Sequence, residues 1–191
     1  RTAGGGTVEV KITQTRIPDV LLIEPQVFGD ARGSFVVTWQ DDVFRREVAD
    51  LGFVQDNQSR SRQWTLRGLH FQSTHTQGKL LRCVIGRIFD VAVDVRRSSP
   101  TFGAWVGTEL SEMNQHQLWI PPGFAHGFLV LSDSADVHYK VSDRYDAGSE
   151  KTILWCDPVI GIEWPLPSGV APVLSPKDAN GTPLRDAAVL P

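Results

Sequence analysis

The chain has 191 residues, of which 41% are hydrophobic and 21% are charged, a balance that suits one globular domain with a substantial core. Its net charge of −3 gives no overall attraction to nucleic acid or to an anionic membrane, and its apolar runs are too short to cross a bilayer. We therefore expect a single domain over residues 1–191, with residues 1–7 as a flexible start, and neither a nucleic-acid partner nor a membrane partner.

Most of the chain shows the alternation of hydrophobic and polar residues, or the short apolar runs, that are typical of β-strands. In chain order the predicted strands are residues 8–12, 35–39, 80–85, 88–95, 108–110, 124–131 and 137–141. Gly86 and Arg87 are expected to form a hairpin turn, and Asp90 and Asp94 fall on one face of the strand that follows. Short strands punctuated by glycine and proline predict an all-β sandwich or barrel.

One helix is predicted between the second and the third of these strands. Asp41 or Asp42 can cap its start, and Gly52 supplies its end. The helix has a buried stripe at helical spacing, formed by Phe44, Val48 and Leu51. Residues 166–191 are rich in proline and glycine and are expected to form a C-terminal arm that packs back on the body.

The most informative segment for function places Arg67 and His70 three residues apart in an apolar, strand-like run. In a regular strand their side chains would point to opposite faces. Gly68 lies between them, and an isolated glycine in a strand often marks a bulge, which would let both side chains reach one cavity. An arginine can anchor an anion, and a histidine can transfer a proton near neutral pH. This pair therefore predicts a site for a phosphorylated substrate.

Four further residues are candidates for the same chemistry, and each has a structural alternative. His126 follows a rigid Pro-Pro-Gly turn, although a single histidine is more often structural than catalytic. Lys79 opens an apolar strand, where it is either solvated or faces inward to stabilise an oxyanion. Tyr139 is either a core residue with a bonded hydroxyl or a proton donor. Asp178 is a turn or cap residue unless the arm brings it to His70, where it would fix the imidazole tautomer.

Cofactors and cellular context are constrained by what the sequence lacks. It contains no Gly-x-Gly-x-x-Gly or Walker-type loop, which disfavours the folds that bind nucleotide cofactors. Cys83 and Cys156 lie far apart without metal-type spacing, and no signal-peptide pattern opens the chain. These features favour a cytoplasmic protein with reduced thiols.

Together these segments resemble the deoxysugar-nucleotide epimerases typified by dTDP-4-dehydrorhamnose 3,5-epimerase, a branch of the cupin superfamily. The likeness runs from about Pro25 to Leu184, nearly the whole chain. Its markers are residues 30–35, 55–59, 67–72, 78–80, 99–103, 119–128, 139–140, 157–158 and 164–165. Each motif is weak by itself, but so many motifs in the same order make the resemblance specific.

The resemblance implies a cupin-type jelly-roll β-sandwich that forms a homodimer and needs neither a metal nor an organic cofactor. It implies epimerisation of dTDP-4-dehydro-6-deoxy-D-glucose at C3 and C5. The general base, its partner carboxylate, the proton donor and the cation that stabilises the enolate are matched, in that order, by His70, Asp178, Tyr139 and Lys79. The diphosphate would be held by Arg67, and the same pocket would be lined by Gln55, Asn57, His126, Tyr145, Glu150 and Lys177. Arg32 and Phe35 match residues that reach into the neighbouring subunit's site.

Two positions depart from the family pattern. Val37 stands where the family often has an acidic residue, which puts one contact to the nucleotide across the subunit boundary in doubt. Phe71 stands where many members have tyrosine, so an aromatic ring is kept and a hydroxyl is lost. Neither change touches the implied acid–base residues.

Three alternatives remain open at the level of the sequence. Relatives in antibiotic pathways act at C3 alone or at C5 alone with nearly the same residues. Residues 121–126 also resemble the second half of metal-binding cupins, but no glutamate accompanies His70 and His75 at a fitting distance, so no metal is predicted. A non-catalytic sugar-nucleotide-binding module is the third alternative, and the joint presence of the four implied catalytic residues argues against it.

Overall fold

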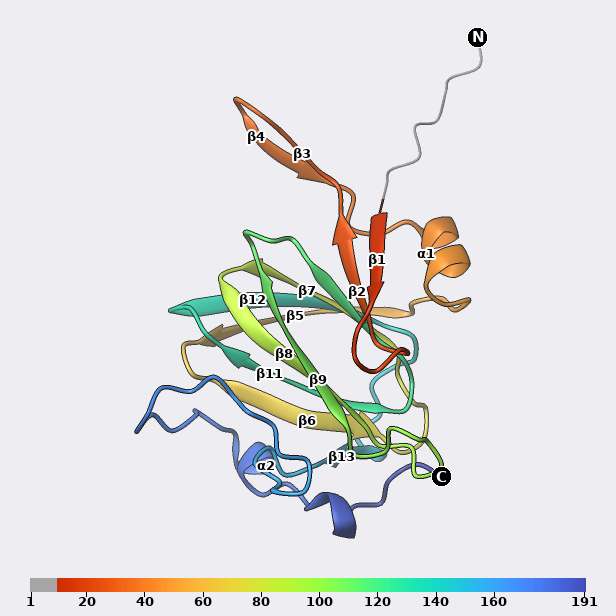
Figure 1. The fold of residues 1–191 in the computed structure, drawn as a ribbon, viewed down its shortest axis with the longest axis vertical. Helices are drawn as coiled ribbons and strands as arrows, with labels where there is room; N and C mark the ends of the chain where they lie inside the picture. The colour runs from red at the N-terminus through yellow and green to blue at the C-terminus, as the bar shows by residue number, and fades with distance from the viewer. Residues whose placement is uncertain (1–9) are drawn as a thin grey trace.

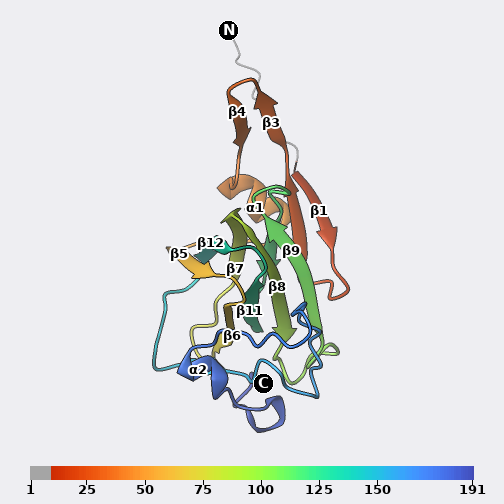
Figure 2. The same ribbon diagram turned by 90° about the vertical axis from the view of Figure 1, so that its left-hand side faces the viewer.

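The computed structural model describes residues 10–191. The predicted flexible start at residues 1–7 and the first two residues of the predicted strand 8–12 therefore lie outside the described part. Two antiparallel β-sheets face each other, and a separate hairpin projects away from them (Figures 1 and 2). The all-β sandwich predicted from the alternation is confirmed.

The six-stranded sheet contains β1 (Val10–Gln14), β2 (Leu21–Pro25), β5 (Gln55–Arg62), β7 (Lys79–Ile85), β10 (Gln117–Ile120) and β12 (Ser134–Val141). Its spatial order is β1-β2-β10-β7-β12-β5. The five-stranded sheet contains β6 (Leu66–Gln72), β8 (Arg87–Asp94), β9 (Trp105–Ser111), β11 (Phe124–Val130) and β13 (Glu150–Thr152). Its spatial order is β13-β6-β11-β8-β9. The projecting hairpin pairs β3 (Val27–Asp30) with β4 (Gly33–Val36).

The helical elements are short: α1 (Asp41–Glu47), α2 (Pro176–Ala179) and the 3-10 helix η1 (Leu184–Asp186). Within residues 10–191, no helix is both long and apolar enough to cross a membrane.

The main core lies between the two sheets, and β8 shows how alternation builds it. Ile88 faces this core, and Asp90 and Asp94 lie on the same face, fully buried, as predicted. The opposite face of β8 contributes Val91 to a second cluster, which includes Leu184 from the C-terminal segment. Both faces of β8 are therefore covered, one by the other sheet and one by the C-terminal segment.

The predicted hairpin at Gly86 is wrong, because β7 and β8 belong to different sheets. The chain turns at Gly86 with φ +77° and crosses from the six-stranded to the five-stranded sheet. The crossing from β11 back to β12 packs against this turn, where the Arg87 N–H donates to Ser132 Oγ at 2.8 Å. A Cβ on Gly86 would lie only 2.1 Å from the carbonyl oxygen of Ser134. Glycine is needed here because two sheet crossings meet.

The start of α1 differs from the prediction. Gln40 is the N-cap, and no side chain caps the first turn, so neither Asp41 nor Asp42 acts as the predicted cap. Both aspartates lie in the first turn instead, where negative charge favours the helix dipole. Asp41 accepts a hydrogen bond of 3.0 Å from Arg45 one turn later.

The end of α1 also comes earlier than predicted, at Glu47 rather than near Gly52. The backbone opens at Val48, where φ is −116°, so the helical ladder stops there. Phe44 is buried, and Val48 and Leu51 pack in the same cluster, so the predicted apolar stripe is confirmed although its last members lie beyond the helix.

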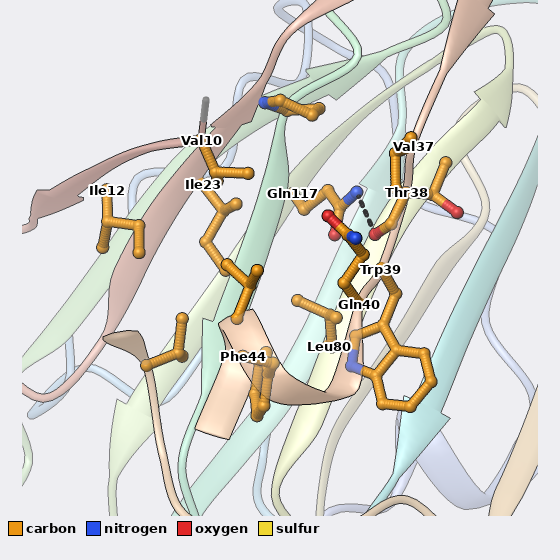
Figure 3. A pocket seen from close by; sticks show the side chains of 13 residues that line it. Val10, Ile12, Ile23, Val37, Thr38, Trp39, Gln40, Phe44, Leu80 and Gln117 are labelled. Carbon is orange, nitrogen blue, oxygen red and sulfur yellow. Dashed lines mark hydrogen bonds between the residues drawn. The ribbon is translucent and has the colours of Figure 1, made fainter. Parts of the chain in front are cut away.

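The predicted strand 35–39 ends at Val36, because the following residues turn onto the outer face of the six-stranded sheet. Gln117 Nε2 donates to the Thr38 carbonyl at 2.8 Å and holds this stretch in place (Figure 3). With α1 and β1 the stretch closes a small pocket of about 40 Å³, to which Ile23 and Leu80 contribute. The pocket is lined by apolar and neutral polar side chains, so it is a packing feature rather than a candidate active site.

After β13 the chain runs along the outer face of the five-stranded sheet and carries α2 and η1 (blue in Figures 1 and 2). Isolated bridges join Thr65 to Val173 and Ile153 to Thr182. Leu184 is buried in the cluster on this face. The path brings α2 against β6, the strand that contains His70.

Candidate active site

A cavity of about 310 Å³ lies between the two sheets, since its walls come from both of them. The residues that line it are Gln55, Asn57, Ser59, Arg67, His70, Gln77, Lys79, His126, Phe128, Tyr139, Tyr145 and Glu150. The fold therefore brings together most of the residues named from the sequence. Asp178 and Lys177 contact this wall from α2, whereas Arg32 and Phe35 lie elsewhere.

Three lining residues were not predicted: Ser59, Gln77 and Phe128. Ser59 continues the inward face of β5 two residues after Asn57, so the alternation of that strand could have identified it. Phe128 follows His126 at the same spacing in β11. Gln77 precedes β7 in an irregular segment, where no periodic signal exists.

The predicted bulge in β6 is confirmed. His126 pairs with His70 and Phe128 pairs with Arg67, so two residues of β6 stand opposite one residue of β11. Gly68 has φ +120°, and a Cβ there would lie 2.5 Å from the Cα of Gly127. The bulge lets Arg67 and His70 line the same cavity although they lie three residues apart.

His70 is bound by a carboxylate from the C-terminal arm. Its Nε2 lies 2.5 Å from Asp178 Oδ1, and Ser175 Oγ donates to the other carboxylate oxygen at 2.7 Å. Burial alone would raise the pKa of Asp178, but the hydrogen bonds from His70 and Ser175 outweigh it and lower that pKa. An ionised Asp178 accepts the Nε2 proton of the ring, which leaves Nδ1 of His70 as the proton acceptor.

Lys79 is buried rather than solvated. Burial lowers its pKa to about 8, against an opposing effect of the Asp90 and Glu150 charges. Its Nζ donates a long hydrogen bond of 3.4 Å to the backbone carbonyl oxygen of His70, so the ammonium group lies beside β6. Lys79 thus supplies a positive charge in a cavity wall close to the proposed base.

His126 forms a buried pair with Asp90, a residue that the sequence analysis did not assign to the site. His126 Nε2 lies 2.8 Å from Asp90 Oδ1, and burial lowers the pKa of this histidine despite the neighbouring carboxylate. The other Asp90 oxygen has no hydrogen-bond partner within residues 10–191. The imidazole of His126 is therefore neutral at pH 7 and is oriented from behind by Asp90.

Asp94 shares a strand face with Asp90 but has a structural role. Its oxygens accept hydrogen bonds from Arg96, Ser99 and Thr101 in the loop after β8. Burial raises the pKa of Asp94, yet these bonds dominate and bring it to about 2. Asp94 thus stabilises a loop, whereas Asp90 orients His126 in the cavity wall.

Tyr139 and Arg67 face the cavity together. Burial raises the pKa of Tyr139, and the positive charge of Arg67 offsets part of that rise, so the phenol is protonated at neutral pH. Arg67 Nε donates to Ser61 Oγ at 3.0 Å. The cavity wall thus holds a protonated phenol and a cation.

Glu150 connects the rim of the cavity to the C-terminal arm. Its Oε2 accepts hydrogen bonds from Tyr145 Oη at 3.0 Å and from Lys177 Nζ at 2.8 Å. Burial would raise the pKa of Glu150, but the bond from Lys177 and the nearby His70 lower it. Lys177 directly precedes Asp178, so this ion pair also anchors the helix that carries the partner of His70.

Arg32 and Phe35 do not line the cavity of their own chain. Both belong to the β3–β4 hairpin segment, which projects from the sandwich (Figure 1). The Arg32 side chain is 90% exposed and pairs with Asp30, and Phe35 is 65% exposed. Their predicted contact with a neighbouring subunit stays a prediction.

The cavity combines a carboxylate-aligned imidazole, a buried cation and a protonated phenol. Such a set can remove a proton next to a carbonyl group, stabilise the resulting enolate and return a proton to the carbon. Within residues 10–191, no three His, Cys, Asp or Glu side chains are grouped so that they could hold a metal ion.

Comparison with known proteins identifies the family of the chain. The sequence profile of the family described as dTDP-4-dehydrorhamnose 3,5-epimerase matches residues 14–186. The dTDP-4-dehydrorhamnose 3,5-epimerase of Neisseria gonorrhoeae is 55% identical over 89% of this chain, which spans 51% of that relative's length. The enzyme of the same name from Shigella flexneri is 53% identical, and the match covers 93% of this chain and 98% of that enzyme.

A solved structure shares the fold as well. The crystal structure of dTDP-6-deoxy-D-glucose-3,5-epimerase from Legionella pneumophila, in complex with dTDP-4-keto-L-rhamnose, superposes with a TM-score of 0.89. That protein is 49% identical in sequence, and the match covers 93% of this chain and 94% of the other. The chain belongs to the dTDP-4-dehydrorhamnose 3,5-epimerase family of isomerases.

Proposed function

We propose that this chain converts dTDP-4-dehydro-6-deoxy-D-glucose to dTDP-4-dehydro-L-rhamnose by epimerisation at C3 and C5. The proposal is carried by one observation, the convergence of the His70–Asp178 pair, Lys79 and Tyr139 on a single cavity. Membership of the family and the ketosugar bound in the Legionella pneumophila relative support the choice of substrate.

The chemistry follows from the C4 ketone, which acidifies the hydrogens on C3 and C5. His70 Nδ1 takes the proton, the C–H electron pair moves to the C4 oxygen, and Lys79 stabilises the enolate. Tyr139 then gives a proton to the same carbon from the opposite face, which inverts it. Before the second carbon reacts, His70 releases its proton to solvent and the Tyr139 phenolate takes up a proton from solvent, so both groups return to their starting states. Each step moves only a proton, so the reaction consumes neither an oxidant nor a reductant.

Substrate binding would rest on Arg67, which can hold the diphosphate through paired N–H groups. Its two terminal nitrogens donate no hydrogen bond to any of residues 10–191 and are free for a ligand. The remaining wall can contact the sugar and the base through Gln55, Asn57, His126, Tyr145, Glu150 and Lys177.

Proton NMR of the product formed in deuterium oxide tests the proposed reaction. We expect deuterium at both C3 and C5 of the ketosugar and the L-rhamno configuration. Deuterium at one carbon alone would replace the proposal by a C3-only or a C5-only epimerase. No deuterium in either position would indicate a non-catalytic sugar-nucleotide-binding module. Activity that is lost with a chelator and restored by a divalent cation would instead indicate a metal-dependent cupin.

The rate is expected to fall as the pH rises through about 8, because the pKa of Lys79 lies at about 8 and only its charged form stabilises an enolate. The pKa of Lys79 in the folded protein is depressed, so its ammonium charge is present below about pH 8 and is lost above it. In the alkaline range kcat/KM should drop about tenfold for each pH unit.

Two variants separate Lys79 from the other titrating groups. Lys79→Arg keeps its charge to higher pH and should shift the alkaline decline upward. Lys79→Met should lose about a hundredfold or more in kcat at pH 7, since the oxyanion loses its cation. A pH profile of kcat/KM for the three proteins decides the matter, and an unchanged alkaline decline in Lys79→Met would rule the lysine out.

A homodimer in which the β3–β4 hairpin serves the neighbouring site is the second part of the proposal. Large apolar side chains of the hairpin are exposed, namely Val27, Phe28 and Phe35. A two-stranded hairpin is marginally stable by itself, so burial of these apolar side chains against another surface would stabilise it. A second copy of the chain would supply that surface and would receive Arg32.

Complementation between two defective variants tests this arrangement. Arg32→Ala and His70→Ala are each expected to impair activity. In a mixed dimer, one site combines an intact His70 with an intact Arg32 from the other subunit, so random mixing should restore about a quarter of the wild-type sites. Co-expressed variants with no more activity than the two separate homodimers would show that Arg32 does not act across subunits.

A further inference from the structure

Arg67 is bound from behind by a buried serine, Ser61, which does not itself line the cavity. Arg67 Nε donates to Ser61 Oγ at 3.0 Å. Ser61 is only 7% exposed and lies on the inward face of β5, the same face as the lining residues Asn57 and Ser59. The contact joins the two sheets, because Arg67 belongs to β6.

The contact restricts which edge of the guanidinium meets a ligand. A guanidinium is planar and carries five N–H donors in a fixed arrangement. When Nε is bound to Ser61, the edge formed by the two terminal nitrogens remains for a paired contact with an oxyanion. Neither terminal nitrogen has a partner within residues 10–191, so that edge of Arg67 is available on the cavity side.

The backbone around Arg67 does not fix this side chain by itself. The bulge at Gly68 interrupts the regular strand pairing, and an arginine has four rotatable side-chain bonds whose ordering costs conformational entropy. Ser61 removes part of that freedom before a ligand arrives. Burial raises the pKa of Tyr139, which lines the same cavity, and the positive charge of Arg67 offsets part of that rise.

We propose that Ser61 is a positioning residue that presents Arg67 to the diphosphate of the substrate. The inference rests on the proposed function, because it needs Arg67 to hold the diphosphate. Ser61 does not touch the substrate and acts only through the arginine.

A double-mutant cycle measured by calorimetric binding of dTDP and of thymidine tests the proposal. Ser61→Ala should weaken dTDP binding about five- to tenfold, because the arginine must then be ordered by the ligand. Thymidine lacks the diphosphate, so its affinity should change less than twofold. In the Arg67→Ala background, Ser61→Ala should change dTDP affinity by less than twofold.

Three further variants separate positioning from loss of stability. Ser61→Thr keeps a hydroxyl acceptor and should retain most of the affinity for dTDP. Ser61→Cys fills the same volume but offers Arg67 only a weak hydrogen-bond acceptor, so its affinity for dTDP should match that of Ser61→Ala. It provides this test even if the alanine variant folds badly. Ser111→Ala is the matched control, because Ser111 is 5% exposed and its Oγ accepts from the Asn114 N–H away from the cavity. It should lower the melting temperature without changing dTDP affinity.

The outcomes distinguish this inference from the proposed function. If wild-type protein binds dTDP and Arg67→Ala weakens that binding, but Ser61→Ala and Ser61→Cys do not, only the role of Ser61 is overturned. If Ser61→Ala weakens binding equally with and without Arg67, the serine does not act through the arginine and the inference fails. If Arg67→Ala leaves dTDP affinity unchanged, the diphosphate contact and the inference are both wrong.

Discussion

Replacement of His70 by alanine is expected to stop exchange of the C3 and C5 hydrogens with solvent, while dTDP binding stays within about threefold of wild type. The imidazole is the proposed proton acceptor, and Asp178 aligns it at 2.5 Å. A positioned general base typically contributes roughly a hundredfold to ten-thousandfold to the rate, so kcat should fall by about that factor. Deuterium incorporation measured by NMR and calorimetric binding of dTDP report the two effects separately.

His116→Ala is a suitable control for that variant. His116 lies near Glu24 and does not line the cavity, so its loss should leave exchange unchanged. Wild-type rates of exchange in His70→Ala would show that another group is the base. Loss of dTDP binding together with loss of exchange would indicate a disrupted cavity rather than a missing base.

Replacement of Tyr139 by phenylalanine is expected to separate proton removal from inversion. The variant keeps the ring that packs against the core between the sheets and removes only the hydroxyl. His70 can still form the enolate, so some deuterium should enter the substrate, whereas the inverted product should fall about a hundredfold or more. We expect the larger loss at C5. NMR that follows deuterium content and configuration at each carbon measures both quantities.

Tyr145→Phe is the matched control, since these are the two tyrosines of the chain. Tyr145 donates to Glu150 at the rim and is half exposed, so its hydroxyl should affect KM more than inversion. An equal loss of exchange and inversion in Tyr139→Phe would argue against Tyr139 as the proton donor. A selective loss of inversion in Tyr145→Phe would transfer that role to Tyr145.

The fold class could be predicted because strand alternation is a local property. Side chains of a strand alternate between its two faces, and this period of two placed Asp90 and Asp94 correctly on one face of β8, although both faces of that strand are buried. The pairing of strands is not local. Gly86 has the backbone of a turn, but β7 pairs with β10 and β12, whereas β8 pairs with β9 and β11 in the other sheet. The predicted hairpin is therefore a crossing between sheets.

The same division applies to the candidate site. The bulge at Gly68 was predictable because an isolated glycine inside a strand commonly marks a bulge or a close approach of two backbones, and it placed Arg67 and His70 in one cavity. Whether Lys79 is solvated or buried was not predictable, because the answer depends on the opposite sheet. The different roles of Asp90 and Asp94 also depend on which neighbours the fold supplies.

By itself, the amino-acid sequence determined that the chain forms a β-sandwich, that it belongs to a family of sugar-nucleotide epimerases, and which side chains line most of the cavity. Alternation and short motifs carry this information within a few residues of each position. The family resemblance implied that Asp178 is the partner of His70, but only the tertiary structure shows how the C-terminal arm brings them together across 108 positions of the sequence. It alone decided that Asp90 binds His126 and that Ser61 binds Arg67. These contacts result from sheet pairing, strand register and the path of the C-terminal arm, which local periodicity does not specify.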